Sequence, residues 1–136
     1  MRERLTAAAY IAGWKITSKL PQPVAKVLFE WGADVASRNG KGPEQLRRNL
    51  ARVVGPENVT RDLVRRSMRS YMRYWREAFQ LPAMAGPELA AELNRNFVPG
   101  SLEALHASAE SGRGTIIALP HAGNWDMAGV WLVHHY

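Results

Sequence analysis

Two polar side chains near residue 120 have the types and the spacing for general acid–base chemistry. His121 and Asp126 lie within the segment Pro-His-Ala-Gly-Asn-Trp-Asp at residues 120–126. A neutral imidazole can take a proton from an alcohol, and a carboxylate on its other ring nitrogen fixes the tautomer and stabilises the imidazolium. This pair could therefore activate a hydroxyl group for attack on a thioester carbonyl, without a nucleophilic serine or cysteine of the enzyme.

The residues around the pair predict a strand followed by a helix. Residues 115–119 read Thr-Ile-Ile-Ala-Leu, a continuous apolar run that is typical of a strand buried on both faces. Asn124 can cap the next helix, and Asp126 would lie in its first turn, where the helix dipole favours an ionised carboxylate. His121 would follow the carboxyl end of the strand, where open α/β sheets gather their functional groups.

The spacing of His121 and Asp126 also has a purely structural alternative. A histidine at a strand end and an aspartate placed by the helix dipole give the same pattern, so the spacing alone is a weak motif. On one continuous helix, side chains five positions apart diverge by roughly 140° and would not meet. A strand–loop–helix corner that contains Gly123 can bring them together.

Apolar residues recur at helical spacing before residue 110. Residues 1–36 predict an amphipathic helical hairpin broken by Pro21 and Pro23, and its second helix has an apolar stripe of Val24, Val27, Leu28, Trp31 and Val35. Residues 43–110 predict further helices: one after Pro43, one capped by Thr60 and rich in arginine, and two shorter ones around 87–97 and 101–110.

Residues 115–136 complete the chain as a strand–loop–helix unit that carries the motif. Only one strand is predicted, and a doubly buried strand needs neighbours for its backbone hydrogen bonds. We therefore expect residues 1–136 to be the N-terminal part of a single, larger α/β domain, and we expect this chain alone to be inactive.

Composition narrows the classes of function. The formal net charge is +6, which favours an acidic partner surface, and the absence of cysteine excludes a thiolate nucleophile and cysteine-ligated metal sites.

His134 and His135 are adjacent on a predicted helix and point in different directions, so no metal site is expected. The apolar run after Arg4 is about half the ~20 residues that span a bilayer, and it predicts an interfacial or packed helix.

The segment Leu-Pro-His-Ala-Gly-Asn-Trp-Asp at residues 119–126 resembles the His-x4-Asp block of the glycerolipid and lipid A acyltransferase superfamily. The order of residues in this block is similar to that of the bacterial lauroyl/myristoyl branch of the superfamily. Two further blocks, Trp-Gly-Ala-Asp at 31–34 and Ser-Tyr-Met-Arg-Tyr-Trp-Arg-Glu at 70–77, resemble the actinobacterial phosphatidylinositol mannoside acyltransferases.

The resemblance implies a layered acyltransferase fold, to which this chain gives the N-terminal helices, the first core strand and the next helix. It implies transfer of a fatty acyl group, palmitoyl in the expected case, from acyl-CoA to a mannose hydroxyl of a phosphatidylinositol mannoside. His121 would be the general base at the thioester end of acyl-CoA, and Asp126 would orient it. Acyl-CoA would be a co-substrate, with no cofactor, and the protein would bind peripherally to the anionic cytoplasmic face of the plasma membrane.

Two alternatives from other classes stay open. A basic nucleic-acid-binding module could be built on the arginine-rich helix at 60–79, but it gives no purpose to the predicted strand and the motif, so no nucleic-acid partner is expected. A non-catalytic membrane-binding fragment is the second alternative.

Overall fold

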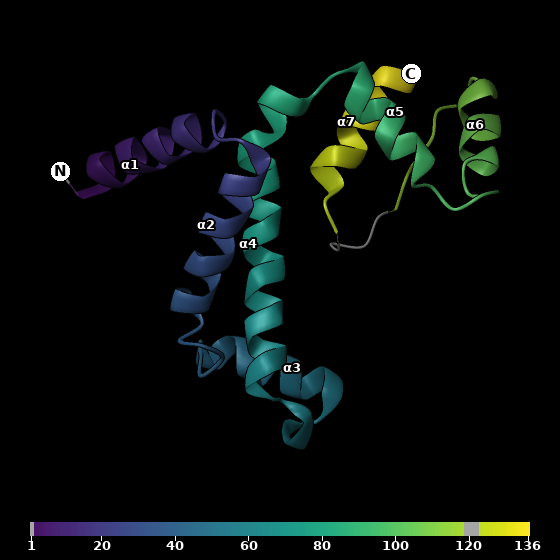
Figure 1. Cartoon of the computed structure of the whole chain (residues 1–136). Coiled ribbons are helices and arrows are strands. Elements are labelled where there is room, and N and C mark those ends of the chain that lie inside the picture. The colour runs from purple at the N-terminus through teal and green to yellow at the C-terminus, as the bar shows by residue number, and fades with distance from the viewer. Residues whose placement is uncertain (1, 119–122) are drawn as a thin grey trace. The chain divides into compact units, whose positions relative to one another are not determined.

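The computed structural model describes residues 2–118 and 123–136. The chain divides into two compact units, Met1–Ala83 and Met84–Tyr136, and each is described by itself. Over the described residues the secondary structure consists of seven α-helices and one short 3-10 helix, as Figure 1 shows. The helices predicted from the sequence are thus confirmed, whereas the division into a single domain stays a prediction.

The first unit contains α1 (Arg2–Thr17), α2 (Gln22–Ala36), α3 (Glu44–Val54), the 3-10 helix η1 (Pro56–Asn58) and nearly all of α4 (Arg61–Met84). Their ends follow local sequence rules. Proline lies in the first turn of α2, where a missing N–H costs nothing. Gly55 ends α3 with φ +86°. The Thr60 hydroxyl accepts the Leu63 N–H at 3.1 Å, which confirms the predicted cap of α4.

α2 and α4 lie side by side (Figure 1). α2 turns its small residues inward, since Ala25 and Ala33 are fully buried, as is Val64 on α4. The apolar stripe predicted on α2 faces solvent instead: Val27 is 65% and Trp31 67% exposed. Small residues of α2 are thus the buried ones, and the large apolar residues of this helix lie outside.

Gln80 on α4 joins the end of α1 to the rest of the unit. Its amide nitrogen donates to the Leu20 carbonyl at 3.0 Å and to the Thr17 carbonyl at 3.5 Å, and the side chain is buried. This buried amide therefore connects α4 to the end of α1 and to the turn that follows it. Nearby, the rings of Tyr10 and Phe29 contact Phe79 edge-on, with centroids 5.3 and 6.3 Å from it.

An ion pair between Asp34 on α2 and Arg69 on α4 also connects these two helices. Arg69 Nε donates to one Asp34 oxygen at 2.8 Å, and a terminal nitrogen of the guanidinium donates to the other oxygen. This fork places two parallel charge-assisted hydrogen bonds between the helices. The hydrogen bonds from Arg69 hold the pKa of Asp34 below its ordinary value of 3.8, although partial burial acts in the opposite direction.

The second unit contains α5 (Pro87–Arg95), α6 (Glu103–Glu110) and α7 (Trp125–His135). α5 and α7 pack against each other around Trp131, which is 1% exposed. Its ring lies 4.7 Å from that of Phe97, and its indole N–H donates to Asn94 at 3.4 Å. A buried tryptophan with a partner for its N–H is a stable centre for a small helical unit.

The strand predicted over residues 115–119 requires a correction. Residues 115–118 form no strand, and Ile116 is 99% and Ile117 43% exposed, while Leu119 lies outside the described residues. The physical reason is that no ladder partner is found in the part of the chain that the structure describes, and a strand without one leaves its N–H and C=O groups to water. The described residues are therefore helical and irregular, and the layered α/β fold stays a prediction.

None of the described helices has a stretch that is both long and apolar enough to cross a membrane.

We expect Asp34→Asn to lower the melting temperature at neutral pH by a few degrees, because an amide cannot hold the Arg69 fork as a charged acceptor. The pKa of Asp34 is lower in the folded than in the unfolded chain. The stabilisation is therefore fully present above the ordinary pKa and is lost as the pH falls through the lowered one. Thermal melts followed by circular dichroism at neutral and strongly acidic pH test this, and the difference between the two proteins should vanish in acid.

Asp62→Asn is the matched control, because the ion pairs that Asp62 forms among the described residues are with Arg65 and Arg66 of its own helix. An equal loss in Asp62→Asn, or a difference for Asp34→Asn that persists in acid, would contradict the role given to the fork.

Candidate active site

The amino end of α7 is built as the sequence predicts. Asn124 Oδ1 accepts the backbone N–H of Met127 at 3.3 Å, so Asn124 is the N-cap of α7. Gly123 precedes it with φ +70°, a left-handed conformation that glycine adopts without strain. The chain therefore turns sharply just before the helix begins.

Asp126 lies in the first turn of α7 and is partly buried. The first N–H groups of a helix and its dipole stabilise a negative charge at this place. His121, the predicted general base, lies outside the described residues. Asp126 thus lies in the first turn of the helix, as the sequence predicts, whereas its catalytic role and its pairing with His121 stay predictions.

An apolar cavity of about 270 Å³ lies beside the amino end of α7. Its walls come from α5 and the residues that follow it, through Leu93 and Phe97, and from α7, through Met127, Ala128 and Trp131. Asn124 also lines it, so the cavity reaches the residue that caps the helix. Hydrocarbon and aromatic walls with few polar groups suit an apolar ligand.

Trp131 is the residue of this region whose importance the sequence did not reveal. It forms a wall of the apolar cavity, and His135 stacks on its ring with centroids 4.2 Å apart. His106 lies near the Trp131 ring and forms a hydrogen bond with the Tyr136 hydroxyl at 2.6 Å. The only sign of Trp131 in the sequence is that it is an aromatic residue in the middle of an apolar helix, and many residues have such a place.

Metal ligation finds no support in the described part of the chain, where no three histidine or acidic side chains gather at one point. His135 instead contacts the Trp131 carbonyl through Nδ1 at 3.0 Å.

The arginines of α4 are largely paired. Asp62 contacts Arg65 and Arg66, and the remaining pairs are Asp34 with Arg69 and Glu77 with both Arg73 and Arg76. This arrangement favours a helix held by carboxylates over a row of free cations that would follow a nucleic-acid backbone.

Comparison with known proteins gives one family. The family model described as "Bacterial lipid A biosynthesis acyltransferase" matches residues 1–136. A phosphatidylinositol mannoside acyltransferase from Mycolicibacterium smegmatis is 51% identical over 135 residues, which cover 98% of this chain and 43% of that protein. One of the same name from Mycobacterium tuberculosis (strain CDC 1551 / Oshkosh) is 49% identical over 130 residues, covering 94% of this chain and 40% of the relative.

No solved structure matches the chain. The chain spans about two fifths of the length of the curated relatives it matches. Since the family model covers every residue, including the motif at 120–126, the chain belongs to the bacterial lipid A biosynthesis acyltransferase family.

Proposed function

We propose that this chain carries the general base of an acyltransferase that moves a fatty acyl group, palmitoyl in the expected case, from acyl-CoA to a mannose hydroxyl of a phosphatidylinositol mannoside. The observation that supports this most directly is the first turn of α7, where Asn124 caps the helix and Asp126 lies beside its positive end. The names of the relatives support the acceptor, and the pairing of the α4 arginines disfavours the nucleic-acid alternative.

In the proposed reaction His121 removes the proton from the acceptor hydroxyl as its oxygen attacks the thioester carbonyl. The tetrahedral intermediate collapses, the carbon–sulfur bond breaks, and the imidazolium returns the proton to the departing thiolate of CoA. Asp126 accepts a hydrogen bond from the second ring nitrogen and stabilises the imidazolium while it exists. No covalent acyl-enzyme is required.

The apolar cavity beside α7 is the proposed place for the carboxyl-proximal part of the acyl chain. Its lining includes Phe97, Met127 and Ala128, and it reaches Asn124, which lies three positions after His121 in the sequence. Burial of each methylene group contributes about 0.8 kcal/mol, so a cavity of this kind discriminates between long and short acyl donors.

The proposed mechanism is tested in a chimera in which this chain replaces the matching residues of the Mycolicibacterium smegmatis relative. We expect His121→Ala to reduce transfer from radiolabelled acyl-CoA by about 10²–10⁴-fold, the typical contribution of a general base. Asp126→Asn should impair transfer strongly as well, because an amide cannot stabilise the imidazolium.

Circular dichroism verifies that both variants fold. More than about a tenth of the parent rate in His121→Ala contradicts the general-base role, and near-normal turnover in Asp126→Asn favours a helix-dipole role for that residue. The isolated chain, assayed alongside, should show no transfer, since Ile116 and Ile117 are exposed in it rather than packed.

For the acyl cavity, we expect Ala128→Phe in the same chimera to abolish transfer of long-chain acyl groups and to spare transfer of short ones, because the ring fills the cavity. Val133→Phe is the matched control, since Val133 lies on the same helix and is 80% exposed. Rates with palmitoyl-CoA and butyryl-CoA measure the effect. An unchanged ratio of the two rates in Ala128→Phe would place the acyl chain elsewhere.

Membrane attachment is proposed to be peripheral, at the cytoplasmic face of the plasma membrane. It would rest on the exposed apolar stripe of α2, which comprises Val24, Val27, Leu28, Trp31 and Val35, together with the net positive charge.

Flotation with vesicles that contain anionic lipid should recover the protein at low salt and much less at high salt. Val27→Ser should weaken binding more than Val53→Ser, although Val53 on α3 is the more exposed of the two, at 82% against 65%. Failure of high salt to release any protein would rule out this mode.

A further inference from the structure

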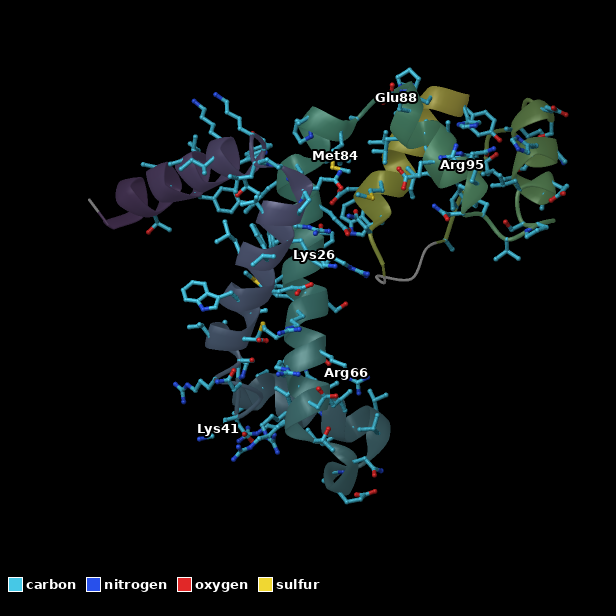
Figure 2. All side chains as sticks on the ribbon, viewed as in Figure 1. Lys26, Lys41, Arg66, Met84, Glu88 and Arg95 are labelled. Atoms are coloured by element: carbon cyan, nitrogen blue, oxygen red, sulfur yellow. The ribbon has the colours of Figure 1, made fainter. Side chains whose placement is uncertain are left out.

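A second cavity, of about 330 Å³, lies between α2 and α4 in the first unit. Its polar lining comprises Lys26 and Glu30 from α2, and Arg69, Ser70, Arg73 and Arg76 from α4. Lys26 and Glu30 are four residues apart on α2, and Ser70, Arg73 and Arg76 follow one another at three residues on α4, so each set lies on one face of its helix. Figure 2 shows Lys26 where α2 runs beside α4.

The charges of this cavity do not balance. Its lining has four cationic side chains and a single carboxylate, that of Glu30. Arg69 is satisfied by Asp34, whereas Arg73 and Arg76 both contact the same oxygen, Glu77 Oε1, at 3.8 and 3.3 Å. Lys26 forms no ion pair with the described residues. Even when Asp34 and Glu77 are counted, a positive charge remains uncompensated.

One of these cationic side chains has a buried hydrogen-bond donor that lacks an acceptor. The Arg76 side chain is 17% exposed, and its Nε is buried without a hydrogen-bond partner among the described residues. A guanidinium N–H that is removed from water and left unpaired is unfavourable, and the cost is larger for charged groups than for neutral ones. Since Arg76 lines the cavity, an oxygen-rich anion that reached its Nε from there would supply the missing acceptor.

We propose that the cavity between α2 and α4 binds a phosphate group. Guanidinium groups present forked donors that match phosphate oxygens, and a lysine ammonium adds a mobile point charge. The Ser70 hydroxyl offers a further donor. The uncompensated charge and the number of donors favour a multiply oxygenated anion over a single carboxylate. This inference does not depend on the acyl-transfer proposal.

The phosphate could be free or part of a lipid headgroup, and two soluble probes distinguish these sources. Inorganic phosphate and monomeric dihexanoyl phosphatidylglycerol are each titrated into the 15N-labelled chain at constant ionic strength, with chloride as the balancing anion. The observable is the Nε–H signal of Arg76. A saturable shift with inorganic phosphate indicates a free phosphate ligand. A saturable shift with the lipid but not with inorganic phosphate indicates a lipid headgroup.

Variants decide whether the cavity is responsible. Lys26→Gln and Arg73→Gln should each weaken binding of the effective probe about tenfold. Arg66→Gln is the matched control, because Arg66 also lies on α4, also pairs with a carboxylate one turn away, and has 68% side-chain exposure against 64% for Arg73. It lies nearer the amino end of α4, away from Lys26 (Figure 2). A saturable shift with neither probe, or equal weakening by Arg66→Gln and Arg73→Gln, would overturn the proposal.

Discussion

The fork between Asp34 and Arg69 is the contact on which the packing of the first unit depends. α2 offers α4 mainly small buried residues, Ala25 and Ala33, so the apolar area between the two helices is modest. Two parallel charge-assisted hydrogen bonds add direction to that packing and fix which face of each helix meets the other. Further along α4, the Gln80 amide contacts the end of α1 and the turn after it, through the carbonyls of Thr17 and Leu20.

Two surface features follow from this choice of faces. With its small residues turned toward α4, α2 exposes the larger apolar side chains Val27 and Trp31, and this stripe suits a lipid surface better than water. Because Arg69 is turned toward Asp34, its neighbours one turn away on α4 line the basic cavity with Lys26. Exposed apolar groups and a basic cavity thus accompany one helix–helix contact, and the proposed membrane and phosphate contacts rest on them.

The second unit depends on Trp131 in the way that the first depends on the fork. The indole fills the space between α5 and α7, and its N–H is satisfied by Asn94. A tryptophan buried in this manner holds α7 in place, and with it the capped first turn that carries Asp126. The same ring forms a wall of the apolar cavity. Positioning of the carboxylate and shaping of the proposed acyl site therefore rest on one side chain.

The helices and their caps were predictable from the sequence because they depend on local rules. The Thr60 and Asn124 caps and the end of α3 at Gly55 are satisfied within a few residues of chain. The motif around Asp126 was recognisable for the same reason, since its residue types and spacing are local. What the sequence could not determine was which groups meet across a distance, such as Asp34 with Arg69 or Trp131 with Phe97. The prediction of a strand at 115–119 was wrong over residues 115–118 for the same reason. An apolar, β-branched run is able to pair as a strand, but a strand forms only where the tertiary structure supplies a partner for its backbone.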